Sequence, residues 1–272
     1  MPRPFRLPAA LIVLMATALP AAAHDFWIVP ETPVMETPGE TRIDFRIGHA
    51  GDVQNWPLRP DRVLSWQSVG PNGLTDQQAG LTTGADADLP VILDAPGLHL
   101  VSVITQDSIS ELTAKRFNDY IEKEGLKDVI DHRERTRGTR RKGVERYSRR
   151  GKTLIAVGDW ARTGMDHVTQ PLGHTLEITP LANPMTTAPG ERLALEVRYR
   201  GERLPNAVVR FSPLHTVEDP ETLRTDADGR VEIVMPEGGQ WLLHVVWSTV
   251  LPDGSDQPYD TIFSSFSFPG AR

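Results

Sequence analysis

Short runs of alternating polar and apolar residues recur along most of this 272-residue chain, with turn-forming residues between them. The runs cover residues 42–47, 63–66, 91–93, 99–104, 153–157, 193–199, 207–211, 230–234, 241–247 and 261–268. Such alternation predicts half-buried β-strands, and short strands at this spacing are typical of a β-sandwich. The 22 Gly and 23 Pro residues are spread along the chain, as in a β protein with many loops.

Residues 108–152 have a different character. Residues 111–124 carry Leu112, Phe117, Tyr120 and Ile121 on one helical face, and Gly125 ends this predicted helix. A second helix is expected over residues 126–135. Ten Arg and Lys residues then lie between positions 133 and 152. This run would suit docking to an acidic partner or to anionic lipid, but charge runs usually mark solvated faces. We therefore favour a solvated connector whose arginines pair with acidic residues of the sandwiches.

Together these patterns predict a mainly β protein with two Ig-like or transthyretin-like β-sandwich domains, joined by a short helical basic connector. The predicted division is a signal peptide at 1–23, an N-terminal sandwich at 24–107, the connector at 108–152 and a C-terminal sandwich at 153–272. The C-terminal unit resembles transthyretin-like extracellular modules, which suggests a scaffold and not a chemistry.

The first 23 residues read as a secretory signal peptide. Arg3 and Arg6 form a basic start, residues 7–19 are apolar but too short to span a bilayer, and Ala21–Ala23 fit a cleavage site. Removing 23 of the 272 residues leaves 249, and the net charge changes from −7 to −9 because two arginines are lost. We expect an acidic periplasmic protein with no membrane-spanning segment in the mature chain and no affinity for nucleic acid.

Cleavage after Ala23 would leave His24 as the first residue of the mature chain. Its α-amine, with a pKa near about 7.7–8.0, loses its proton readily to a metal ion, and the imidazole reaches the same ion. The alternative is that a cleavage site for small residues merely happens to precede a histidine.

Further metal ligands would have to come from distant strands, because no two of the eight histidines are spaced i, i+2 or i, i+4. His49 follows a strand in a Gly-containing loop and is the second candidate; His244 and His99 lie within strands and are the third and fourth. For a strand histidine the alternative is a hydrogen-bonded structural role. Cysteine is absent, so histidine, amine and carboxylate ligands would favour nickel, copper, cobalt or zinc.

Signals for enzymatic catalysis are lacking. The sequence has no GxSxG motif, no cysteine nucleophile and no phosphate-binding loop. Asp226, Asp228 and Gly229 form an ordinary turn signal and not a calcium loop. We therefore expect that the protein is not an enzyme.

Several segments resemble the domain-of-unknown-function family 4198. They are residues 23–30 (AHDFWIVP), 115–121, 145–154 (ERYSRRGKTL), 176–184, 225–230 and 239–241. The resemblance implies an exported β protein, and some members accompany energy-coupling transporters for nickel or cobalt as the extracytoplasmic metal-binding part. By this resemblance His24 carries over as an amine and imidazole ligand.

The leading hypothesis is therefore a periplasmic protein that captures a divalent transition metal through His24, with nickel as the expected ion, for delivery to an importer in the inner membrane. One alternative is a non-metal binding or structural module at the cell surface. A lower-ranked alternative is a copper-dependent oxidoreductase that uses the N-terminal histidine.

Overall fold

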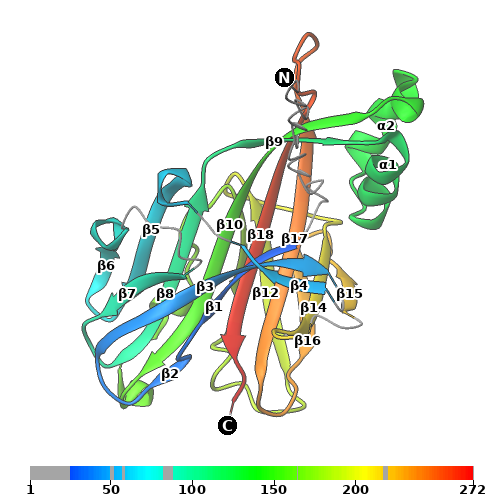
Figure 1. Ribbon diagram of the computed structural model, residues 1–272. Helices are drawn as coiled ribbons and strands as arrows, with labels where there is room; N and C mark the ends of the chain where they lie inside the picture. The colour runs from blue at the N-terminus through cyan, green and yellow to red at the C-terminus, as the bar shows by residue number, and fades with distance from the viewer. Residues whose placement is uncertain are drawn as a thin grey trace, which may run out of the picture.

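The computed structural model describes residues 25–49, 52–56, 59–81, 88–163, 165–216 and 220–271. This part of the chain is mainly β, as predicted, with two α-helices (Figure 1). The strands of the first half are β1 (Asp25–Pro30), β2 (Val34–Met35), β3 (Gly39–His49), β4 (Asp52–Asn55), β5 (Val63–Gly70), β6 (Gly73–Asp76), β7 (Asp88–Leu93), β8 (Gly97–Thr105) and β9 (Ser108–Leu112). Those of the second half are β10 (Gly143–Val157), β11 (Leu176–Pro180), β12 (Arg192–Tyr199), β13 (Glu202–Arg203), β14 (Val208–Pro213), β15 (Glu221–Arg224), β16 (Arg230–Val234), β17 (Gln240–Val250) and β18 (Tyr259–Pro269).

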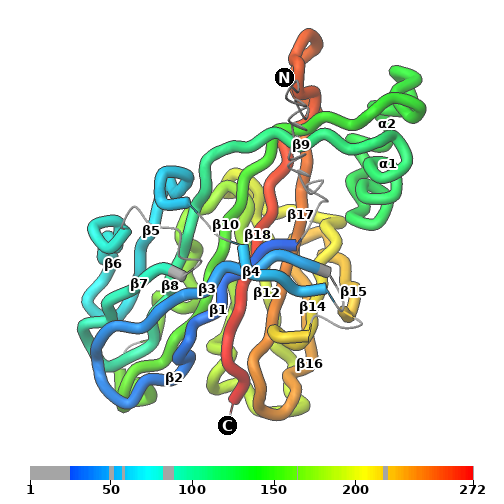
Figure 2. The backbone as a smooth tube through the Cα atoms, in the orientation of Figure 1, coloured from blue at the N-terminus to red at the C-terminus, as the bar shows by residue number. Residues whose placement is uncertain are grey.

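One large sheet runs through the centre of the molecule. Its strand order is β15-β14-β17-β18-β10-β8-β5-β6, with β2 and β9 paired to β10. A sheet of β1, β3, β4 and β7 covers part of one face, and a sheet of β11, β12, β13 and β16 covers the opposite face. Figure 2 shows the first of these small sheets crossing in front of the long central strands.

Each small sheet shares a core with the central sheet. Alternate residues of β10 point in opposite directions. Ile155 and Val157 join a core with Phe26, Ile28 and other residues of the first small sheet. Leu154 and Ala156 join the larger core with β11, β12 and β16. The protein is thus two sandwiches that use the two faces of one continuous sheet.

The helices form at the predicted places. Helix α1 (Ala114–Lys123) begins after Thr113, whose hydroxyl accepts the N–H of Arg116, and Gly125 with φ 66° ends the helical path. Helix α2 (Lys127–Arg135) follows directly. The apolar face of α1 packs on β17 and β18 through Phe117, Tyr120 and Ile121.

The predicted helical connector is wrong at both of its ends. Residues 108–112 and 143–152 are strands, and β10 runs unbroken through the predicted boundary at 152/153. The reason is a long parallel pairing of β10 with β18, which joins residues 145–153 to residues 259–267. The prediction that the basic run is solvated also fails at its end, because Arg149, Arg150 and Lys152 are buried in β10.

Candidate functional site

Strand β1 is buried on both faces and positions the start of the described chain. It pairs antiparallel with β3, with Asp25 opposite Gly48. Phe26 and Ile28 face the core that the first small sheet shares with the central sheet. A Cβ on Gly151 of β10 would lie 3.1 Å from each of these two side chains. The glycine therefore lets β1 approach β10 closely. His24, the first predicted ligand, lies outside the described residues and is joined to Asp25 by one peptide bond.

Asp25 and His244 meet between β1 and the central sheet. Oδ1 of Asp25 lies 3.2 Å from Nε2 of His244, and both side chains are about 5% exposed or less. The alignment is not that of a hydrogen bond, so the contact is electrostatic. Burial lowers the pKa of His244, and the charge of Asp25 opposes that shift only in part. His244 is therefore neutral near pH 7.

Several buried polar groups gather around His244. Ser265 lies directly opposite it on β18, and Ser212 belongs to the adjacent strand β14. Within the described residues, the hydroxyls of both serines, both ring nitrogens of His244 and Nε1 of Trp27 make no hydrogen bond. Buried polar atoms without partners are uncommon in folded proteins. Their concentration beneath β1 marks this region as a candidate site.

The end of helix α1 is fixed to the same region. Arg210 lies opposite His244 in the β14–β17 register. Its guanidinium binds the carboxylate of Glu124 and donates to the carbonyl of Lys123 at 2.7 Å. Both partners of the ion pair are about 5% exposed or less. The helical hairpin is therefore tied to the strand that neighbours His244.

His49 is the last residue of β3 and pairs with Asp52 of β4. It lies at the end of the β1–β3 ladder where Asp25 pairs with Gly48. Gly48 is required there, because a Cβ would collide with the carbonyl oxygen of Asp52. The sequence placed His49 in a loop, whereas the structure makes it the strand residue that closes the hairpin.

His99 lies elsewhere. Strands β18 and β10 stand between its strand, β8, and the strand of His244. Its Nε2 lies 2.9 Å from the carbonyl of Ala95, and burial lowers its pKa. In residues 25–271, apart from the undescribed gaps, no three His, Asp or Glu side chains are grouped as metal ligands. Among the described candidates, His99 therefore lies apart from His244, and His49 ends β3 in the ladder that positions Asp25.

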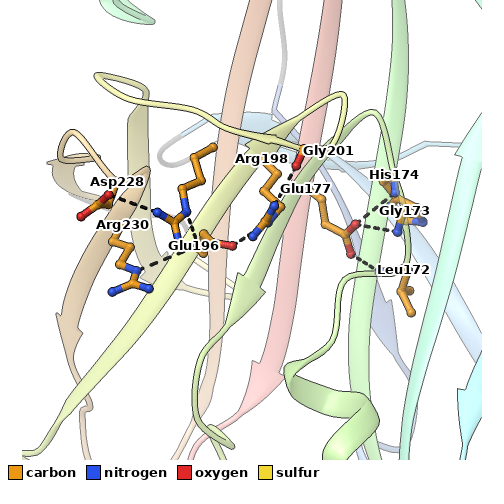
Figure 3. A network of polar contacts seen from close by, with 10 residues as sticks. Leu172, Gly173, His174, Glu177, Glu196, Arg198, Gly201, Asp228 and Arg230 are labelled. Carbon is orange, nitrogen blue, oxygen red and sulfur yellow. Dashed lines mark hydrogen bonds and ion pairs between the residues drawn. The ribbon is translucent and has the colours of Figure 1, made fainter.

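Lys152 and Glu177 form a buried ion pair that the sequence analysis missed. Their charged atoms are 2.7 Å apart, and each side chain is 2% exposed. Glu177 also accepts the backbone N–H groups of Leu172, Gly173 and His174 (Figure 3). Because Lys152 stabilises the charged form, the pKa of Glu177 is lowered despite burial. These contacts join the central sheet to β11 and give the pair a structural role.

A second missed group surrounds Glu145 and Arg149, which lie on the face of β10 below β1 and α1. Glu145 accepts a hydrogen bond from Thr261 at 2.6 Å, but burial raises its pKa to about 7. Arg149 is enclosed by aromatic rings, among them Trp56 at 4.6 Å and Tyr147 at 4.7 Å from its guanidinium carbon. A run of basic residues looks the same in a solvated loop and in a strand that is buried on both faces, so these roles could not be predicted from sequence.

The sheets and their shared cores define a mainly β protein of the sandwich class. The chain belongs to the family described as Domain of unknown function (DUF4198), whose model matches residues 21–249. A search among curated proteins found no match.

Solved structures that align with the chain are distant. A two-domain fibronectin type III segment of chicken tenascin is 11% identical, with 80% of this chain and 87% of that chain covered and a TM-score of 0.21. The D0–D1 domain of intimin is 12% identical, with 90% and 97% covered and a TM-score of 0.21. A tetra-tandem repeat of a large adhesion protein is 11% identical, with 91% and 49% covered and a TM-score of 0.24.

Among the described residues, neither α-helix has the length and apolar character needed to cross a bilayer.

Proposed function

We propose that this protein is exported to the periplasm, that its mature chain begins at His24, and that it captures a divalent transition metal there. Nickel is the expected ion, and copper, cobalt and zinc are the alternatives. The α-amine and imidazole of His24 form the chelate, and His49 supplies the next ligand. The metal is then delivered to an energy-coupling importer in the inner membrane.

The buried contact between Asp25 and His244 carries this proposal. A mobile N-terminus would lose conformational entropy on binding a metal. The contact fixes the residue that follows His24 at the end of the ladder, and His49 ends the neighbouring strand there. The proposal uses neither His244 nor His99 as a ligand, because both imidazoles are almost fully buried and two strands of the central sheet separate them.

The test is a calorimetric titration of nickel into protein that begins at His24. His24→Ala and His49→Ala should each weaken binding at least tenfold. His215→Ala is the matched control, because His215 is exposed and contacts Gln240 away from the start of β1. Equal nickel affinity in the parent protein and in His24→Ala would overturn the proposal. No binding of any of the four metals would favour a non-metal binding module.

A further inference from the structure

Arg149 is a buried cation without a counter-ion in contact. Its side chain is 6% exposed. Within the described residues its guanidinium makes no hydrogen bond and no ion pair, and its Nε is buried and unpartnered. Burying a charge that lacks hydrogen bonds is costly, and arginines in protein interiors are normally paired.

Aromatic rings form the walls around this guanidinium. Its carbon lies 4.6 Å from the ring of Trp56, 4.7 Å from Tyr147, 5.6 Å from Phe263 and 5.8 Å from Phe26. Cation–π contacts of this kind stabilise the charge but use no N–H donor. Trp56 and Tyr147 are only half-buried, so this side of the enclosure is partly exposed to solvent. The terminal N–H groups of the guanidinium, which make no hydrogen bond among the described residues, therefore remain available to a ligand.

Glu145 does not serve as the counter-ion. It is two residues away on the same face of β10, but its carboxylate binds the hydroxyl of Thr261 and makes no ion pair with Arg149. Burial raises the pKa of Glu145 to about 7, although the charge of Arg149 opposes this shift in part. At neutral pH the positive charge of Arg149 is thus compensated only in part.

We propose that the guanidinium of Arg149 binds the carboxylate of a small organic acid, and that this acid is the chelator with which the captured metal arrives. A planar carboxylate matches the guanidinium fork, which presents N–H groups of its two terminal nitrogens side by side. The rings of Trp56 and Tyr147 offer flat apolar surfaces to the carbon skeleton. Phe26, which contacts Arg149, is the second residue of β1, so the enclosure lies near the start of the described chain. The chelator part of this inference rests on the proposed function.

Citrate is the probe, titrated alone, with equimolar nickel, and against inorganic phosphate as the competing anion. The protein that begins at His24 should bind citrate, and Arg149→Gln should weaken that binding at least tenfold. Arg149→Lys, which keeps the charge but loses the fork, should give an intermediate loss. Arg150→Gln is the matched control, because Arg150 is also a buried arginine with an unpartnered Nε but points to the opposite face of β10.

The results separate this inference from the proposed function. If the protein binds citrate but binds nickel in no titration, the Arg149 site is supported and metal capture is refuted. If nickel affinity is unchanged by citrate and by substitution of Arg149, the inference is refuted and metal capture is supported. Phosphate binding as tight as citrate binding would also overturn it, because the site would not select an organic acid. If Arg149→Gln does not fold, Arg149→Lys provides the same comparison.

Discussion

Nε2 of His244 lies 3.2 Å from Oδ1 of Asp25, and this buried contact joins the first described strand to the penultimate one. The contact fixes β1 on the central sheet at the residue that follows His24. It thereby couples the stability of the fold to the position of the proposed metal ligand.

Replacing His244 with leucine should destabilise the protein by about 1–3 kcal/mol, because the buried carboxylate of Asp25 would lose the imidazole as a polar neighbour. Urea unfolding monitored by circular dichroism measures this loss. His215→Leu, at an exposed position, should change stability by less than about 0.5 kcal/mol. Equal stability of the two variants would show that the Asp25 contact does not hold β1.

Glu145 should make the protein less stable as the pH rises. Its pKa is about 7 in the folded state and 4.5 in the reference state, so the stability present below pH 4.5 is lost as the pH rises through about 7. Thr261, Ser110, Arg149 and Tyr120 are the groups that face it.

Glu145→Gln mimics the protonated side chain and should remove this dependence. The free energy of unfolding of the variant minus that of the parent protein should be about 2 kcal/mol larger at pH 8 than at pH 5.5. Urea unfolding of both proteins at both pH values measures this change. A constant difference between the two proteins would mean that Glu145 titrates normally.

The Lys152–Glu177 pair should behave as a coupled unit. Lys152→Met should cost about 3–5 kcal/mol because it leaves Glu177 buried without its cation. Glu177→Ala should cost more, since three backbone N–H groups also lose their acceptor.

A double-mutant cycle by chemical unfolding measures the coupling between Lys152 and Glu177, which should exceed about 1 kcal/mol. Disruption of the exposed Lys127–Asp131 pair by Lys127→Ala is the control and should cost less than about 0.5 kcal/mol. Additive effects at Lys152 and Glu177 would contradict the description of a buried ion pair.

Gly143, the first residue of β10, allows this strand to pass beneath Phe117 of α1. A Cβ at this position would collide with the aromatic ring, so Gly143→Ala should cost about 1–3 kcal/mol. Gly39→Ala is the control, because the nearest atom to its added Cβ is the methyl carbon of Met35 at 3.9 Å. Thermal unfolding of the two variants makes the comparison. Equal melting temperatures would show that α1 and α2 shift to accommodate the added methyl group without a loss of stability.

Local periodicity was enough to predict most strands and both helices. Strand 241–247 is an example: its alternation placed His244 on the face opposite Trp241 and Trp247, and the structure confirms this. The single shared sheet was not predictable, because the parallel pairing of β10 with β18 joins segments more than 100 residues apart. Nor could alternation show that Arg149 and Lys152 are buried, since charged residues carry no apolar signal. The Asp25 partner of His244 also depends on a long-range contact.

The most direct test of the central claim compares nickel binding by the chain that begins at His24 with binding by the same chain carrying one additional residue before His24. The extra residue converts the α-amine into an amide and leaves the imidazole intact, so it removes only the chelate. The account predicts at least a tenfold loss of nickel affinity in the extended protein, with unchanged thermal stability in the absence of metal. Equal affinity in the two proteins would contradict it.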